Sequence, residues 1–385
     1  MLRTAAALSS LLLASACAGA ADTPPATPEA PSDLSLELTE IATGLEFPWG
    51  MAALPSGDML VSEREGRLRI LRAGTLDPTP LEGLPDDIYV NRQGGLLDVA
   101  LHPDFQTNGM VYLSYSQGDS DSNQTTIIRG TLNDGATALE NVEQVFSAHM
   151  PEKRGGAHFG SRIVFMNDGA MIVTTGDGYR WMDLAQDPTS HFGKVLRMTD
   201  TGEPLPDNPF FDQGGPAQYV WTYGHRNVQG AAYNPATGML YTHEHGPKGG
   251  DELNIIEAGT NYGWPEITYG VDYDGSIISS ETEMEGMAQP ATYWVPSIAP
   301  SGMLFYTGEA YPGWQGDLLI GAMQGPAGRK LVRVELDEAG QVVGREDLLA
   351  DLGEGYRDVE IGADGKLYLA TIDIDGKIYR ADIAE

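Results

Sequence analysis

The sequence predicts an all-β protein, a six-bladed β-propeller whose long inserted loops form a site at one end of the central channel. Three observations lead to this fold class. Six times along the 385 residues, a glycine in a polar turn is followed by an apolar alternating run, a second turn and often a second run. No window longer than about 12 residues has a convincing helical period. The 48 glycines and 41% hydrophobic residues are typical of a turn-rich globular β protein.

Each of the six units has the signature of a β-hairpin, because period-2 runs bounded by Gly, Asp and Asn indicate paired strands. The units follow one another at roughly 50 to 75 residues, with inserted loops between them. One four-stranded sheet per unit, arranged radially, gives six blades. A pair of packed sheets, a β-sandwich, is the alternative. The units are SGDMLVSEREGRLRIL from Ser56, NGMVYLSYSQGDSDSNQTTIIRGTL from Asn108, DGAMIVTTGDG from Asp168, TGMLYTHEHGPKGGDELNIIEAG from Thr237, QGDLLIGAMQGPAGRKLVRVEL from Gln315 and DGKLYLATIDIDGKIYRADI from Asp364.

The N-terminal segment is expected to be an export signal followed by a tether. Residues 1–17 have one positive charge and an apolar run too short to cross a bilayer, which indicates a signal peptide. It ends in a lipobox-like LLASAC, so Cys17 is a candidate for lipid attachment, with plain cleavage at an A-x-A site as the alternative. Residues 18–33, rich in Pro, Ala and Thr, are expected to be an extended linker, and residues 34–385 the propeller. We therefore expect a periplasmic or secreted protein, anchored to a membrane only through Cys17, the single cysteine.

The formal net charge of −32 excludes some partner classes. A nucleic acid or an anionic membrane surface would be repelled, so neither is expected as a partner. Solubility is the plain explanation of this acidity. Surplus carboxylates also favour divalent cations such as Ca²⁺.

The stretch Gln218–Trp264 concentrates unusual chemistry, with three of the seven histidines and the pair Arg226 and Asn227. Arg226 is a planar, permanent cation suited to carboxylates or a developing anion, and Asn227 both donates and accepts. An arginine that only ties two blades together is the alternative. The turn EHGPKGGDELNIIEAGTNYGW offers the oxygen ligands that Ca²⁺ prefers, although it is not an EF-hand and acidic loops are most often merely solvated. Its candidate ligands are the carbonyls of Gly246 and Pro247 and oxygens of Asp251, Glu252, Asn261 and Tyr262.

Three further loops carry candidates, each with a structural alternative. Gln93 in NRQGGLLDVALHPDF could be a surface turn residue. His158 in GGAHFGSRIVF could be a core histidine, or a general base if its imidazole is neutral. Arg357 in GYRDVEIGADG lies just before the opening strand of the last blade, beside Asp358. The Gly-x-Ser-x-Gly, GxGxxG, P-loop and His-Glu-x-x-His motifs are missing, which argues against serine hydrolysis and Rossmann-type nicotinamide chemistry.

Taken in order, these loops resemble the soluble pyrroloquinoline quinone (PQQ)-dependent glucose/sorbosone dehydrogenase family, and especially its bacterial aldose sugar dehydrogenase branch. The resemblance covers nearly the whole predicted propeller. It is carried by FPWGMAALPSGDMLVSEREGRLRIL from Phe47, QGGLLDVALHPDF, HFGSR, AQDPTSHFGKVLRM, PDNPF, YGHRNVQG, HGPKGGDELN, NYGWP, YWVPSIAPSGM and YRDV.

The resemblance implies a six-bladed propeller that oxidises aldoses with PQQ and Ca²⁺. His158 is then the general base for the anomeric hydroxyl, a hydride passes to C5 of the quinone, and a lactone forms. Gln93 is implied near the reacting centre, and Arg226 is implied to polarise the quinone oxygens. An external electron acceptor completes the reaction. The implied cofactor-binding residues are Gln93, His158, Arg226, Asn227 and Arg357.

The resemblance also implies two calcium sites, and the sequence departs from the family pattern at three places. One Ca²⁺ bridges to PQQ from the carbonyls of Gly246 and Pro247, and a second, structural ion is held at Glu252 and Tyr262. Gly355 stands where better-known members have an arginine. Their lysine falls near Met323 and Gln324, which makes Lys330 an additional cofactor candidate. Trp294 is one place out of register with their sugar-contacting aromatic residues, so glucose specificity is not expected.

Two other functions remain open from the sequence. One is a Ca²⁺-dependent lactone hydrolase, in which Glu, Asn and Asp side chains would hold a central metal. The other is a non-catalytic binding propeller, whose signature would be the loss of His158 or Arg226, although both are present.

Overall fold

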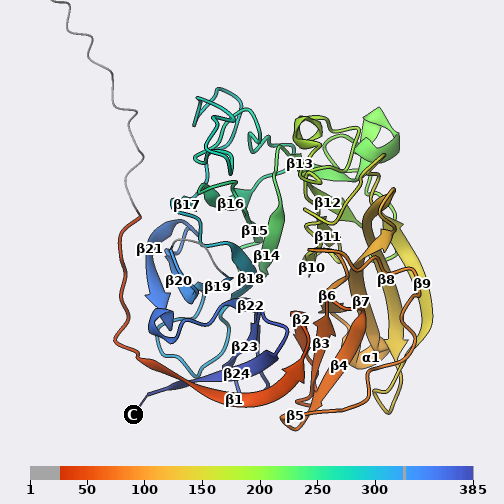
Figure 1. Cartoon of the computed structure of the whole chain (residues 1–385), viewed down its shortest axis with the longest axis vertical. Coiled ribbons are helices and arrows are strands. Elements are labelled where there is room, and N and C mark those ends of the chain that lie inside the picture. The colour runs from red at the N-terminus through yellow and green to blue at the C-terminus, as the bar shows by residue number, and fades with distance from the viewer. Residues whose placement is uncertain (1–26, 324–326, 385) are drawn as a thin grey trace, which may run out of the picture.

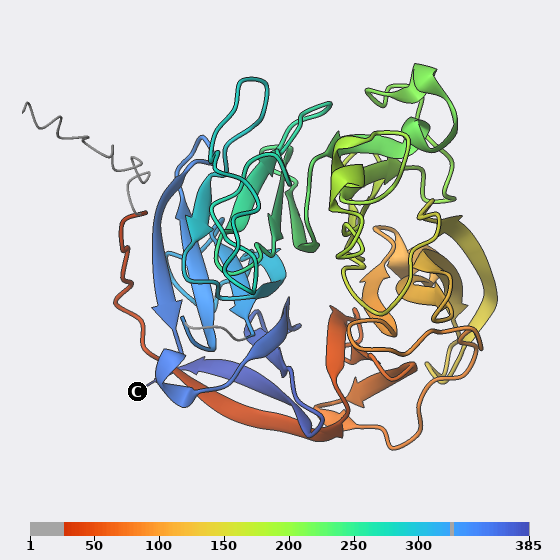
Figure 2. The same ribbon diagram turned by 45° about the horizontal axis from the view of Figure 1, so that its top comes forward.

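The computed structural model describes residues 27–323 and 327–384. The predicted signal peptide, Cys17 and Gln324 therefore lie outside the described residues. Six four-stranded antiparallel sheets surround a central channel (Figures 1 and 2). The predicted all-β, six-bladed propeller is confirmed, and the β-sandwich alternative is wrong.

Blades 1 to 3 run from the channel outward in chain order. Blade 1 comprises β2 (Pro48–Ala53), β3 (Met59–Glu63), β4 (Arg67–Arg72) and β5 (Thr75–Leu76). Blade 2 comprises β6 (Leu96–Leu101), β7 (Met110–Gly118), β8 (Asn123–Leu132) and β9 (Leu139–Ser147). Blade 3 comprises β10 (Ile163–Phe165), β11 (Met171–Thr174), β12 (Lys194–Met198) and β13 (Val220–Tyr223).

Blades 4 and 5 repeat this order, and blade 6 borrows its outer strand from the N-terminus. Blade 4 comprises β14 (Val228–Asn234), β15 (Met239–Glu244), β16 (Asp251–Ile256) and β17 (Thr292–Trp294). Blade 5 comprises β18 (Pro300–Phe305), β19 (Leu318–Ala322), β20 (Lys330–Leu336) and β21 (Val342–Leu348). Blade 6 comprises β22 (Tyr356–Ile361), β23 (Leu367–Thr371), β24 (Gly376–Ile383) and β1 (Leu36–Leu45).

Five of the six repeated units of the sequence contain the second and third strands of a blade, and the unit from Asp168 contains only the second strand of blade 3, β11. The unit from Ser56 contains β3 and β4, for example, and the unit from Asp364 contains β23 and β24. These strands pack against both neighbouring sheets, so their apolar alternation is strong. Leu60, Ile70 and Leu113 illustrate this in the fully buried core between blades 1 and 2.

The ring closes where the two ends of the propeller meet. Strand β1, red in Figure 1, pairs with the blue strand β24 from Leu36–Ile383 to Leu45–Gly376. Just before β1, Ala30 donates its backbone N–H to the Arg345 carbonyl at 3.0 Å, and Arg345 donates back to the Pro28 carbonyl at 3.0 Å. The last part of the predicted linker thus lies along β21, on the outer edge of blade 5.

Helices are few in the described part of the chain, as the sequence predicts. No helix among residues 27–323 and 327–384 is long and apolar enough to cross a membrane. The short helices are α1 (Phe105–Asn108), η1 (Met182–Gln186), η2 (Phe211–Gln213), η3 (Gly215–Tyr219) and η4 (Ala350–Leu352).

The loops that carry the candidate residues meet at one end of the channel. They are the β5–β6, β9–β10, β11–β12, β13–β14 and β15–β16 connections, and segment 257–291 joins them. Two glycines permit one close contact. A Cβ on Gly160 would lie 2.5 Å from the Thr175 backbone, and a Cβ on Gly176 would lie 2.5 Å from the His158 carbonyl oxygen. The β9–β10 and β11–β12 loops can therefore touch directly.

Candidate active site

A cavity of about 760 Å³ occupies the loop end of the channel. Its walls carry the cations Arg64, Lys248 and Arg357, and none of the described residues that line it is an aspartate or glutamate. On a chain with 55 acidic and 23 basic residues, this is a local reversal of charge. Trp49, Phe159 and Tyr273 add aromatic surface, and Gln93, Asn227 and Gln229 add amides. The cavity is suited to an anionic, planar ligand.

His158 does not itself line the cavity, but it directly precedes Phe159 and Gly160, which do. Its Nδ1 is 2.6 Å from Oδ1 of Asp177, and neither side chain is appreciably exposed. Burial lowers the pKa of His158, and the nearby Asp177 only partly opposes this. Burial raises the pKa of Asp177, but His158 and Arg226 outweigh it and the net shift is downward. A neutral imidazole, oriented by an ionised carboxylate, is the arrangement of a general base.

The backbone of His158 is held in an uncommon conformation. Its φ of 52° is in the left-handed region. Gln93 fixes this loop, because its Oε1 accepts the His158 backbone N–H at 2.7 Å. The structure thus brings together two residues that are 65 positions apart in the sequence.

Arg226 does not itself line the large cavity. Its Nη1 donates to the carbonyls of His245 at 3.0 Å and Gly246 at 2.9 Å, while Nη2 reaches the Tyr273 hydroxyl at 3.4 Å. The Arg226 carbonyl accepts the Asp177 N–H at 2.7 Å. Arg226 and the His158–Asp177 pair therefore belong to one connected structure.

Asn227 and Arg357 both line the cavity, as their assigned roles require. Oδ1 of Asn227 accepts the Gly160 N–H at 3.2 Å. Arg357 donates to Oε1 of Gln229 at 2.9 Å and covers the Trp49 ring at 3.9 Å. Its position differs slightly from the sequence-based one, because Arg357 lies within β22 instead of before it. It is buried and forms no ion pair with any described residue, which leaves its charge to the cavity.

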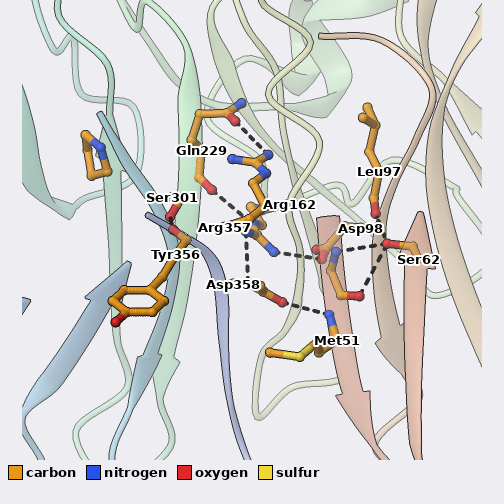
Figure 3. Close-up of polar contacts among 12 residues, drawn as sticks. Met51, Ser62, Leu97, Asp98, Arg162, Gln229, Ser301, Tyr356, Arg357 and Asp358 are labelled. Carbon is orange, nitrogen blue, oxygen red and sulfur yellow. Dashed lines mark hydrogen bonds and ion pairs between the residues drawn. The ribbon is translucent and has the colours of Figure 1, made fainter. Parts of the chain in front are cut away.

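A layer of charged side chains forms the floor of the cavity (Figure 3). Arg162 donates to Oδ1 of Asp98 at 2.9 Å and lies 3.0 Å from Oδ1 of Asp358. Its Nε donates to the Gln229 carbonyl at 2.8 Å. Because these residues come from blades 2, 3, 4 and 6, the layer ties inner strands together across the channel.

Comparisons with known proteins agree with this geometry. The family model for glucose/sorbosone dehydrogenases matches residues 45–380. The chain belongs to the glucose/sorbosone dehydrogenase family. Aldose sugar dehydrogenase YliI of Escherichia coli is 39% identical over 355 residues, covering 91% of this chain and 93% of that protein. The resemblance drawn from the sequence is confirmed.

Solved structures of the family superpose over most of the chain. The apo form of the soluble aldose sugar dehydrogenase of E. coli has a TM-score of 0.85 at 37% identity, covering 91% of this chain and all of that one. The PQQ-bound aldose sugar dehydrogenase of Streptomyces coelicolor has a TM-score of 0.74 at 31% identity, with 92% and 99% coverage.

A separate, small pocket is lined by Arg226, Glu244, Glu252 and Tyr262. Burial raises the pKa of Glu252 well above its usual range, and Glu244 raises it further. Asn254 donates to both carboxylates at 3.3 Å, and its own buried Oδ1 has no partner among the described residues. Tyr262 turns its hydroxyl away, to the Ile255 carbonyl at 2.6 Å. The described residues contain no cluster of three or more His, Cys, Asp and Glu side chains that could hold a metal.

The other calcium candidates have different surroundings. Gly246 and Pro247 line the large cavity, but the Gly246 carbonyl already accepts from Arg226. Asp251 holds the loop instead of facing a cation, because its carboxylate accepts from the backbone of Gly246, Ile298 and Ala299 and from the Ser297 hydroxyl.

The departures from the family pattern have visible causes. Lys330, the additional cofactor candidate, does not line the cavity, since its ammonium is 2.6 Å from Asp347 on the neighbouring strand. An arginine cannot replace Gly355 on this backbone, because a Cβ there would lie 2.3 Å from the Met323 carbonyl oxygen. Trp294 is buried in the blade 4–5 core, with Arg345 5.5 Å above its ring.

Sequence reasoning missed Asp177, Trp49 and Tyr273. Asp177 stands in TTGDG, one of many glycine-rich acidic turns, so nothing local separated it from a surface residue. Tyr273 lies within segment 257–291, whose path back to the cavity has no sequence signal. Trp49 could have been suspected, because an indole at the start of an inner strand points to the channel mouth.

Proposed function

We propose that this protein oxidises aldose sugars at the anomeric carbon to lactones, with PQQ and Ca²⁺, and passes the electrons to an external acceptor. The observation that carries the proposal is the reversed charge of the cavity, beside an imidazole whose pKa is lowered by burial. A tricarboxylate quinone requires cations, and this acidic chain supplies them at that place.

The residues of the cavity fit such a cofactor. Arg357 is buried without an ion-pair partner among the described residues, and the buried Nε of Arg64 has no hydrogen-bond partner there. An anionic ligand would satisfy both groups. Asn227, Gln93 and Lys248 would add donors from the wall. When bound, PQQ supplies the acceptor for the hydride that leaves the anomeric carbon.

We assign to His158 the role of the base that accepts the proton of the sugar. Because Asp177 occupies Nδ1, the nitrogen left for the sugar is Nε2. It takes the proton of the anomeric hydroxyl as the C1–H bond breaks, so the sugar loses two electrons and two hydrogens and becomes a lactone. Arg226 is close enough to His158 to lower its pKa, which keeps the base neutral.

The pocket of Glu244 and Glu252 fits a Ca²⁺ ion. Its two buried carboxylates are hard oxygen ligands of the kind that this cation prefers. Gly246 and Pro247 are assigned the ion nearer to the cofactor through their carbonyls, one of which is shared with Arg226.

The two other functions have less support. A lactone hydrolase needs carboxylates around a central metal, and none of the described residues that line the cavity is acidic. A binding propeller has no need for a buried His158–Asp177 pair.

Export is part of the same proposal. The signal peptide and the lipobox-like LLASAC support a periplasmic or secreted protein, lipid-anchored through Cys17 or cleaved at an A-x-A site. Expression of the full chain and of Cys17→Ser, followed by membrane fractionation, tests the anchor. If both proteins were distributed equally between the membrane and soluble fractions, the lipid anchor would be ruled out.

Reconstitution tests the enzymatic proposal. Purified apo-protein is mixed with PQQ and Ca²⁺ and assayed with a panel of aldoses and an artificial electron-accepting dye, with PQQ-free protein as the control. We expect dye reduction that requires PQQ, protein and sugar together. If no sugar of a broad panel gives PQQ-dependent reduction, the proposal fails.

A further inference from the structure

Tyr179 is an exposed aromatic residue placed directly against the assigned base. Its ring centroid lies 5.3 Å from that of His158, and the two rings are perpendicular at 88°. The residue is 49% exposed, so much of the tyrosine faces solvent at the loop end of the channel. A side chain that only shielded His158 from water would be expected to lie buried.

The backbone of Tyr179 is strained to hold the ring there. Its φ of 73° is in the left-handed region, where a bulky residue is a genuine outlier. Such strain persists only where the surroundings enforce it, and it concentrates at ligand sites.

Asp177 enforces this conformation through the same oxygen that orients the base. Its Oδ1 accepts the Tyr179 N–H at 2.7 Å and lies 2.6 Å from Nδ1 of His158. The positions of the base and the ring are therefore fixed by one carboxylate. The Tyr179 hydroxyl makes no hydrogen bond with the described residues, so the ring itself is what the loop presents.

We propose that Tyr179 forms the wall of the sugar subsite next to His158 and contributes to substrate choice by packing against the C–H face of the pyranose. This inference rests on the proposed function, because it concerns the sugar whose anomeric carbon meets His158. An aromatic face covers apolar C–H groups, while the hydroxyls of the sugar remain free for donors such as Gln93. Tyr179 is thus a specificity-determining residue and takes no proton.

The test separates sugar binding from catalysis and from cofactor binding. We expect Tyr179→Ala to raise KM for aldopyranoses about threefold to tenfold, the usual effect of losing an aromatic contact. kcat and the affinity of the apo-protein for PQQ, measured by fluorescence titration, should change little. Tyr179→Phe should keep the wild-type KM, because the hydroxyl has no partner.

Two further variants serve as a back-up and a control for this test. Tyr179→Gly relieves the left-handed strain and should show the same rise in KM if Tyr179→Ala folds poorly. Met182→Ala removes an exposed side chain from the same loop, away from His158, and should leave KM unchanged. If the wild type is active and every Tyr179 variant has the wild-type KM, this inference is overturned while the proposed function stands. A loss of PQQ affinity in Tyr179→Ala would also overturn it. An inactive wild type would instead count against the proposed function.

Discussion

Two cavities lie one below the other along the same channel, and their charges are opposite. The upper cavity, about 760 Å³, has three cations and no carboxylate among its described lining residues. The lower cavity, about 320 Å³, is lined by Asp98, Asp358 and Glu360, with Arg162 as its one cation in the described part of the chain. Both are built from the same inner strands.

The difference shows how little sequence separates the two environments. Arg357 lines the upper cavity and Asp358, the next residue, lines the lower one, at an irregularity in the pairing of β22 with β23 between Tyr356 and Asp358. In the same way, Leu97 lines the upper cavity and Asp98 lines the lower one. The negative charge of the lower carboxylates is compensated within the protein. Arg162 supplies a positive charge, and burial favours protonation, since it raises the pKa of Asp358 to about 6 and that of Glu360 to about 8. Of the upper cations, Arg357 and Lys248 form no ion pair with any described residue, and Arg64 meets only the partly exposed Glu65 at 3.6 Å, so this charge is available to a ligand.

The largest expected effect is the removal of the base beside the upper cavity. His158→Ala should lower kcat of the PQQ-loaded enzyme about 100-fold to 10,000-fold, because it removes the assigned general base. Its PQQ affinity should remain. Steady-state kinetics and PQQ titration measure both, with His102→Gln, on the β6–β7 connection, as a control. Full activity of His158→Ala would place the chemistry elsewhere.

The next effect concerns the carboxylate that orients this base. Asp177→Asn should lower kcat about 100-fold or more, because the imidazole loses its tautomer and orientation. Asp177 raises the pKa of His158, so its removal should move the acid limb of the kcat/KM profile to lower pH. A pH profile of both enzymes checks this. An acid limb that moved to higher pH would contradict the assigned pair.

The charge reversal itself is tested by replacing one charged residue of each cavity. Arg357→Met should weaken PQQ binding about tenfold to 100-fold, the usual loss for a hydrogen bond to a charged partner. Glu360→Gln, three positions along the same strand but in the lower cavity, should leave the PQQ affinity unchanged. Equal losses in the two variants would show that the cavities are not electrostatically distinct.

The pocket of Glu244 and Glu252 is a third environment, where a metal instead of a proton should balance the carboxylates. Saturating Ca²⁺ should raise the Tm of the EGTA-treated protein by about 5 °C, and Glu252→Gln should lose most of this rise. Because burial and Glu244 raise the pKa of Glu252, protons compete with the cation and the Ca²⁺ effect should shrink as the pH falls. A full Ca²⁺ effect in Glu252→Gln would move the ion elsewhere.

The smallest effect belongs to the lower cavity. The folded pKa of Glu360, about 8, is above its unfolded value, so its proton stabilises the fold at low pH and stability falls as the pH rises from about 4.5 to 8. Glu360→Gln should therefore reduce the loss of Tm between pH 5 and pH 9 by about 2–4 °C. Thermal melts at both pH values measure it. An unchanged pH dependence would mean that water in the channel already solvates the carboxylate.

Much of the fold could be predicted because the signals are local. Period-2 alternation and glycine turns are properties of neighbouring residues, and they located the second strand of all six blades and the third strand of every blade except blade 3. The inner strands were harder to locate, since β10 has three residues and β14 begins inside the Arg226–Asn227 loop. The closure by β1 joins Leu36 to Ile383, a pairing that no local pattern contains.

The sequence by itself determined the family, the number of blades and the residue types that gather at the site, including His158, Gln93, Asn227 and Arg357, because these depend on chemistry and order along the chain. Only the tertiary structure decided which groups meet. It paired His158 with Asp177, set Glu252 beside Glu244, directed Lys330 to Asp347 and separated Arg357 from Asp358 into two cavities. The physical reason is that these contacts join different strands and loops, so their energies depend on distance in space, which the order of residues does not specify.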